Sequence, residues 1–78
     1  MKIKVLGSGC KKCVKLEKRI KKVIIQNDLD ASVEKVTDII EISKYNLLNT
    51  PGVIINDKVV ASGRLLEEDE IVDLIRAN

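Results

Sequence analysis

The two cysteines of the chain stand close together in the stretch GSGCKKC, at Cys10 and Cys13, with glycines before them and two lysines between them. Thiols at this spacing can carry redox chemistry, bind a soft metal ion or serve as small apolar side chains. The stretch follows MKIKVL, which alternates lysine with apolar residues as a short strand does. A helical pattern comes after it. We therefore expect both thiols at a strand-to-helix junction.

A thiolate at the start of a helix is stabilised by the partial positive charge of the helix N-terminus. Lys11 and Lys12 would add to this effect, so we predict that the pKa of Cys10 lies below the value of about 8.5 for free cysteine. Cys13 lies one turn further on and is expected to be more enclosed. The pattern predicts that Cys10 attacks a partner's disulfide and that Cys13 resolves the mixed disulfide.

Three other uses of the thiols are weighed against this one. Free cysteine is often buried as a small hydrophobe, but flanking glycines and lysines argue against a core position. A structural zinc site needs four ligands, and the chain has no histidine and no third cysteine. Two exposed thiolates before a helix also suit Cu(I), so a Cu(I) carrier is the alternative function. Small copper chaperones, however, have two strands after the first helix, whereas this sequence predicts a strand, a helix and then a hairpin.

Length and composition set the class of protein. The chain has 78 residues, of which 45% are hydrophobic and only Tyr45 is aromatic, which predicts one domain over residues 1–78 with an aliphatic core. The net charge of +2 does not indicate a nucleic-acid partner. Neither a signal-peptide pattern nor an apolar run of about 20 residues is found. We therefore expect a cytoplasmic monomer without membrane contact or cofactor, in a compartment that keeps thiols reduced.

Hydrophobic spacing predicts seven elements in the order β-α-β-α-β-β-α. The first two strands, joined through a helix, should be parallel, and Asn56-Asp57 is typical of a tight antiparallel hairpin. Parallel strands and an antiparallel hairpin together predict an α/β fold with a mixed sheet. We expect strands at residues 2–6, 31–36, 53–55 and 58–61, and helices at 13–27, 39–46 and 67–76.

Lysine and arginine occupy much of the helix that follows the cysteines. Such a face can hold a phosphate backbone. Because the chain has no aromatic residues there to stack bases, we interpret the face as a solvated surface that steers acidic protein partners.

The sequence resembles the thioredoxin-like superfamily over almost its whole length, and most closely its small thioredoxin/glutaredoxin-like redox-active disulfide proteins. The resemblance rests on the CxxC after the first strand, on YNLLNTP at 45–51 and on VIINDKVV at 53–60. It implies a minimal thioredoxin-like α/β fold, with a four-stranded mixed sheet of order 2-1-3-4, and thiol-disulfide oxidoreductase activity. It also implies a cis peptide at Thr50-Pro51 and substrate contacts from Thr50, Pro51 and Gly9, which stands where thioredoxins carry tryptophan. The implied partners are disulfide-containing proteins and a dithiol or flavin-dependent reductase.

Overall fold

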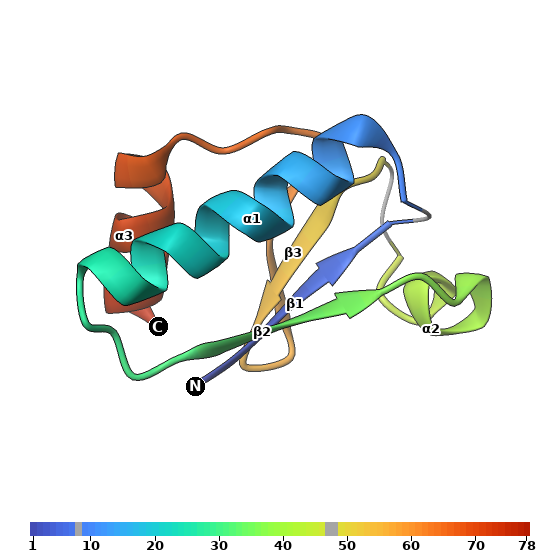
Figure 1. Cartoon of the computed structure of the whole chain (residues 1–78). Coiled ribbons are helices and arrows are strands. Elements are labelled where there is room, and N and C mark those ends of the chain that lie inside the picture. The colour runs from blue at the N-terminus through green and yellow to red at the C-terminus, as the bar shows by residue number, and fades with distance from the viewer. Residues whose placement is uncertain (8, 47–48) are drawn as a thin grey trace.

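The computed structural model describes residues 1–7, 9–46 and 49–78, which build one four-stranded sheet with helices around it (Figure 1). The strands are β1 (Lys2–Leu6), β2 (Ser32–Val36), β3 (Gly52–Ile55) and β4 (Lys58–Ser62), and the helices are α1 (Lys11–Gln26), α2 (Ile39–Ser43) and α3 (Glu68–Ala77). The sheet order is β2-β1-β3-β4, with β1 parallel to β2 and antiparallel to β3. The α/β class, element order and sheet order predicted from the sequence are confirmed.

The core lies between the sheet and two helices. Successive side chains in a strand point to opposite faces, so β1 and β3 each present every second residue to α1 and α3. Figure 1 shows α1 running along the sheet with α3 beside its C-terminal half. The buried cluster consists of aliphatic side chains, as the composition predicts. Its members are Ile3, Val5, Val53 and Ile55 from the sheet, Leu16, Ile20 and Val23 from α1, and Leu66, Ile71 and Ile75 from the C-terminal segment.

The hairpin between β3 and β4 turns at Asn56 and Asp57. Their φ angles are 52° and 65°, and positive φ at both central residues is what a type I′ turn requires. Asn and Asp adopt this conformation more readily than other residues with a side chain. The predicted hairpin is confirmed, and it lies at the end of the sheet where β1 begins, because Ile55 pairs with Ile3.

The opposite end of the sheet positions the site. Leu6, the last residue of β1, pairs with Gly52, the first residue of β3. The chain that leaves β1 at Gly7 therefore passes beside Pro51, which enters β3. Strand register thus brings the cysteine loop next to the Thr50-Pro51 segment, although about 40 residues separate them in the sequence.

Polar contacts connect α1 to the first residue of α3 and to the segment before it. Arg19 Nη1 donates a hydrogen bond to the carbonyl oxygen of Leu66 at 2.6 Å, and Lys22 Nζ lies 3.2 Å from Glu68 Oε2. Both contacts lie in the third and fourth turns of α1, away from the cysteines. Within the part of the chain that the structure describes, no helix is long and apolar enough to cross a membrane.

The segment around α2 is tied to the other face of the sheet. Lys4 alternates with the core residues Ile3 and Val5, so its side chain lies on the face opposite α1. Lys4 Nζ donates to the hydroxyl of Tyr45 at 3.3 Å. This hydrogen bond is the first cause that raises the pKa of Lys4. The link anchors the chain shortly before it reaches the site.

Replacing Leu16 with alanine tests the packing that holds α1 on the sheet. Leu16 is fully buried, and Leu16→Ala is expected to lower the free energy of unfolding by about 2–5 kcal/mol, because it leaves a cavity between α1 and β1. Urea unfolding followed by circular dichroism measures the change. Ile25→Ala is the control, because Ile25 is 79% exposed and its loss should change stability by less than about 0.5 kcal/mol. Equal losses in the two variants would contradict the packing described here.

Candidate active site

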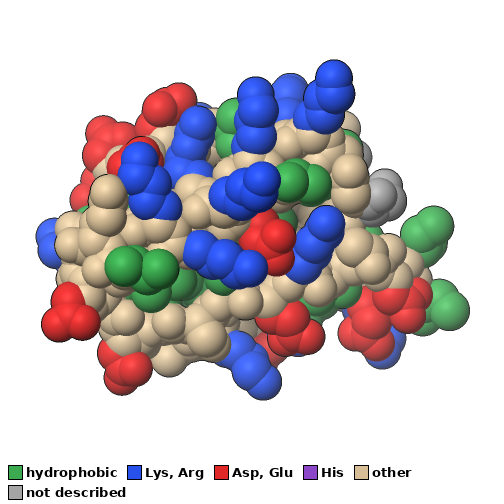
Figure 2. Space-filling view, in the orientation of Figure 1, with side chains coloured by type: hydrophobic (Ala, Val, Ile, Leu, Met, Phe, Trp, Pro, Cys, Tyr) green, Lys and Arg blue, Asp and Glu red, His purple; other side chains and the backbone are tan. Residues whose placement is uncertain are grey.

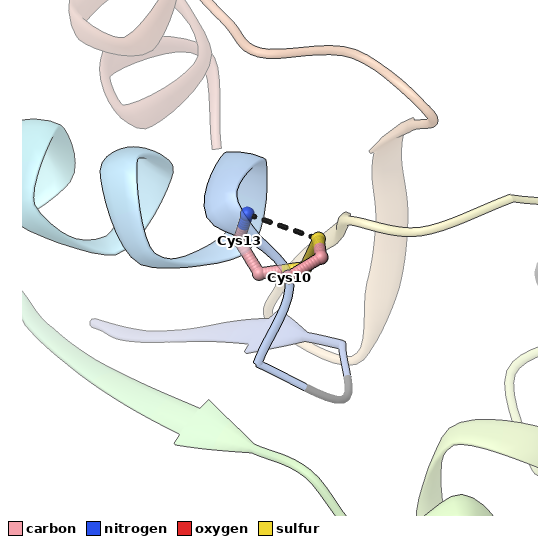
Figure 3. The surroundings of a disulfide bond; sticks show 2 residues. All are labelled: Cys10 and Cys13. Carbon is pink, nitrogen blue, oxygen red and sulfur yellow. Dashed lines mark hydrogen bonds between the residues drawn. A yellow bond between two sulfur atoms is a disulfide. The ribbon is translucent and has the colours of Figure 1, made fainter.

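Cys10 and Cys13 form a disulfide across the first turn of α1 (Figure 3). Their Cα atoms are 5.1 Å apart, which is an ordinary separation for a disulfide. Cys10 is the N-cap residue of α1, and its sulfur accepts a hydrogen bond from the backbone N–H of Cys13 at 3.3 Å. The sulfur takes the place of the side-chain oxygen that caps most helices. Cys10 therefore lies at the strand-to-helix junction that the sequence indicates.

The two cysteines differ in exposure. Cys10 is exposed, whereas Cys13 is only 1% exposed. Cys13 is the first residue of the inward stripe of α1, which continues with Leu16 and Ile20. Spacings of three and four residues keep these side chains on one helix face. The burial of that face therefore decides which sulfur faces solvent, and it is the sulfur of Cys10.

Gly7 provides the space that Cys13 occupies. Gly7 is buried, and a Cβ atom built on it would overlap the sulfur of Cys13 and lie 3.8 Å from the Cβ of Thr50. Gly7, Cys13 and Thr50 therefore meet at one point. The sequence indicated no site role for Gly7, which directly follows the strand expected at residues 2–6. A glycine three residues before a CxxC cysteine is a weak signal, because only the fold shows that a side chain would meet the sulfur.

At Gly9 glycine is favoured by the backbone conformation, whereas at Gly7 it is required for space. Its φ of 88° is a left-handed conformation that side chains rarely adopt, yet nothing lies within 4 Å of the Cβ that it lacks. The residue is exposed directly before Cys10. Backbone conformation thus favours glycine here, and the surface beside Cys10 stays open.

The Thr50-Pro51 segment lies on the other side of Cys13, and its peptide bond is cis. Thr50 is exposed and Pro51 is buried. The carbonyl oxygen of Pro51 accepts a hydrogen bond from the N–H of Gly63 at 2.8 Å. Gly63 has a φ of 73°, and a Cβ on it would lie 2.9 Å from the Cβ of Asn49. The end of β4 therefore positions the segment that carries Thr50, a role of Gly63 that the sequence did not indicate.

Lys11 and Lys12 are exposed in the first turn of α1, which has no acidic residue. Positive charge at this end of a helix opposes the helix dipole. The same charge favours an anion at the helix N-terminus, where the sulfur of Cys10 lies. The first turn is therefore better suited to a thiolate than to the stability of the helix.

The described residues near the disulfide offer neither a cluster of metal ligands nor a buried acid. Among the residues that the structure describes, no three or more Cys, His, Asp or Glu side chains are grouped as metal ligands require. In the same residues no polar or charged side chain is buried, so none of them places a buried acid beside Cys13. Binding of Cu(I) would use the two sulfurs alone, and it stays a prediction.

Comparison with known proteins agrees with this geometry. Residues 1–76 match the family model described as a thioredoxin domain. The chain belongs to the thioredoxin domain family. A thioredoxin of Methanocaldococcus jannaschii is 33% identical over 75 residues, covering 96% of this chain and 86% of that protein. A thioredoxin of Methanothermobacter thermautotrophicus is 29% identical over 75 residues, covering 96% and 97%. The family and the Cys10–Cys13 pair make this protein a thiol-disulfide oxidoreductase, which confirms the resemblance.

Replacing Gly7 with alanine tests the contact with Cys13. The added methyl group must displace the sulfur, so Gly7→Ala is expected to lower the free energy of unfolding by about 1–3 kcal/mol. The measurement is urea unfolding under reducing conditions, where all variants lack the disulfide. The control is the same substitution in a Cys13→Ala protein, where the missing sulfur should reduce the cost by about half or more. An unchanged cost would show that the alanine disturbs the backbone and leaves Cys13 unaffected.

Proposed function

We propose that this thioredoxin-family protein reduces disulfides in other proteins, with Cys10 as the nucleophile and Cys13 as the resolving thiol. The observation that supports these roles is the difference in exposure between the two sulfurs. Cys10 faces solvent at the N-cap of α1, and Cys13 is buried beneath it. A partner's disulfide can approach Cys10 directly, while Cys13 is held within reach of whatever bond Cys10 forms.

The first step begins from the reduced protein. The Cys10 thiolate attacks one sulfur of the partner's disulfide, a new S–S bond forms, and the partner's own S–S bond breaks. The partner's other sulfur leaves as a thiolate and takes up a proton. The helix N-terminus and the N–H of Cys13, which points at Cys10 Sγ, favour the thiolate form of Cys10 before the attack.

The second step closes the disulfide seen in the structure. Cys13 loses its proton and attacks the Cys10 sulfur of the mixed disulfide, which releases the partner's second thiolate. That thiolate takes up a proton in turn. Two electrons have then passed from the protein's dithiol to the partner. A reductase that carries a dithiol or a flavin would return two electrons and two protons to Cys10 and Cys13.

The exposed rim around Cys10 is the proposed substrate surface. Thr50 is exposed, and both Thr50 and Cys13 lie next to Gly7. The backbone of Thr50 is therefore available to an extended segment of the partner. Pro51 has no backbone N–H and therefore donates no hydrogen bond in that pairing. Gly9 leaves open space before Cys10. Together these residues would accept a peptide chain that passes over the sulfurs.

The proposed setting is the reducing cytoplasm, with the protein acting as a one-domain monomer. A dithiol that donates electrons has to be kept reduced, and this compartment does so. Partner disulfides there are transient or catalytic, which suits a protein that reacts and then releases its partner.

Trapping experiments test the order of the two cysteines. In Cys13→Ser the second step cannot occur, so a disulfide-containing peptide should accumulate as a mixed disulfide on Cys10, detected by intact-protein mass spectrometry. Cys10→Ser is the matched control and should form adducts far more slowly, because its remaining thiol is buried. Adducts that form at equal rates on both variants would overturn the assignment.

Substituting the two lysines between the cysteines tests their effect on the thiolate. Lys11→Ala with Lys12→Ala is expected to raise the pKa of Cys10 and make the reduction potential more negative, because the reduced form loses favourable charge. One pKa unit corresponds to about 1.4 kcal/mol, or roughly 30 mV in a two-electron couple. Both lysines are exposed, so this is an upper limit at moderate salt.

The pH dependence of Cys10 alkylation measures the pKa, and equilibration with a dithiol buffer measures the potential. Lys2→Ala with Lys58→Ala is the control, because both residues lie at the other end of the sheet. Overlapping curves for wild type and the Lys11, Lys12 variant would show that the helix N-terminus alone sets the pKa.

A further inference from the structure

Basic residues are concentrated on the helix that begins at the redox couple. α1 contains seven of the chain's 14 lysine and arginine residues and one of its 12 acidic residues, Glu17. Figure 2 shows these basic side chains gathered over α1, while most acidic side chains in the same view lie around its edges. The small net charge of the chain therefore conceals a strongly basic face.

The two halves of α1 differ in how this charge is balanced. Toward the C-terminal end, basic side chains lie near carboxylates. The pairs are Arg19 with Glu67 at 3.9 Å, Lys21 with Glu17 at 3.9 Å and Lys22 with Glu68 at 3.2 Å. Toward the cysteines, none of the lysines forms an ion pair with any residue that the structure describes. These are Lys11, Lys12, Lys15 and Lys18.

Three of the unpaired lysines lie in one row. Lys11, Lys15 and Lys18 are spaced by four and three residues, which places them on one face of α1. That face is the outer one, because the inner face carries the buried residues Cys13 and Leu16. The row, which we call the lysine stripe, begins one residue after Cys10 and extends about 10 Å along the helix.

The stripe is unfavourable for the helix itself. Lysines three or four residues apart repel one another, and positive charge in the first turn opposes the helix dipole. No described acidic residue pairs with the stripe, although three such residues balance the other half of α1. Local rules of helix stability are broken mainly where a site needs it. The unbalanced charge lies where a partner must approach Cys10.

We propose that the lysine stripe binds an acidic surface next to the disulfide of the protein partner, and so selects partners whose disulfides are flanked by Asp or Glu. This inference rests on the proposed reduction of protein disulfides. Exposed charges act over about 10 Å at 0.1 M ionic strength, and the stripe begins directly after Cys10. The attraction speeds the encounter that brings the partner's sulfur to Cys10.

A protein partner fits the surface better than a nucleic acid. Binding of single strands relies on aromatic side chains that stack with bases. The chain has one aromatic residue, Tyr45, and its hydroxyl is held by Lys4 on the face of the sheet opposite α1. The stripe also starts at the redox couple, whose proposed reaction is with a disulfide of another protein.

Three peptides that share one internal disulfide and differ only in their flanking residues test the proposal. The flanks are aspartate, serine or lysine. The pre-reduced protein is mixed with each peptide, and the second-order rate constant of peptide reduction is measured by quenching and mass spectrometry. At about 0.01 M ionic strength the aspartate peptide should react at least about tenfold faster than the lysine peptide. The ratio should approach one near 0.5 M salt, where screening is about 4 Å or less.

Charge reversal locates the effect. Lys15→Glu with Lys18→Glu should bring the ratio between aspartate and lysine peptides to about one or below at low salt. Lys2→Glu with Lys58→Glu makes the same change in net charge at the far end of the sheet and should keep most of the preference. The stripe variant should also unfold thermally at a temperature no lower than wild type, because it removes repulsion between neighbouring lysines.

The outcomes distinguish a failure of partner selection by the lysine stripe from a failure of the proposed disulfide reduction. If the serine peptide is reduced and the three peptides react equally at low salt, the stripe does not select acidic partners. Equal loss of preference in both charge-reversal variants also overturns it, because net charge alone would then be responsible. If single-stranded RNA binds wild type and Cys10→Ser equally and the stripe variant loses that binding, the stripe is a nucleic-acid surface. If no peptide is reduced faster than by Cys10→Ser, the proposed function itself is wrong.

Discussion

Burial of the inner face of α1 against the sheet is the interaction on which the site depends. Leu16, Ile20 and Val23 are almost fully buried in this interface, and each such side chain contributes about 1.5–3 kcal/mol when removed from water. That packing fixes the rotation of the helix about its axis. Cys13 shares the inner face and is therefore buried, while Cys10 at the N-cap is left in solvent. The difference in exposure between the two sulfurs thus follows from the way one helix packs.

Close approach of backbone segments adds a second constraint. The pairing of Leu6 with Gly52 places the ends of β1 and β3 side by side, and the chain near Gly7 has to accommodate the sulfur of Cys13 and Thr50 together. Only a residue without a side chain leaves enough room there. The hydrogen bond from Gly63 to Pro51 holds the neighbouring segment in place. The segment beside the buried sulfur of Cys13 is therefore held by a backbone hydrogen bond.

Charge is distributed against the needs of helix stability. The C-terminal half of α1 has carboxylate partners, and the half next to the cysteines has none among the residues described. Lysines near the N-terminus of α1 oppose the helix dipole, and we propose that they favour the thiolate of Cys10. Lys11 belongs to both the pair between the cysteines and the lysine stripe, so in the two proposals the tuning of the thiolate and the choice of partner share one surface.

The elements and the location of the redox couple could be predicted from the sequence, because apolar spacing, the Asn56-Asp57 turn and the CxxC spacing are local signals. The resemblance to thioredoxins extended this to the sheet order and to Thr50-Pro51. The space at Gly7, the support from Gly63 and the absence of ion pairs near Cys10 could not be predicted. Each depends on atoms that are brought together only by strand register and helix packing, between residues that are distant in the chain. Local sequence therefore determined which groups react, and tertiary packing decided which sulfur is exposed and which charges remain unpaired beside it.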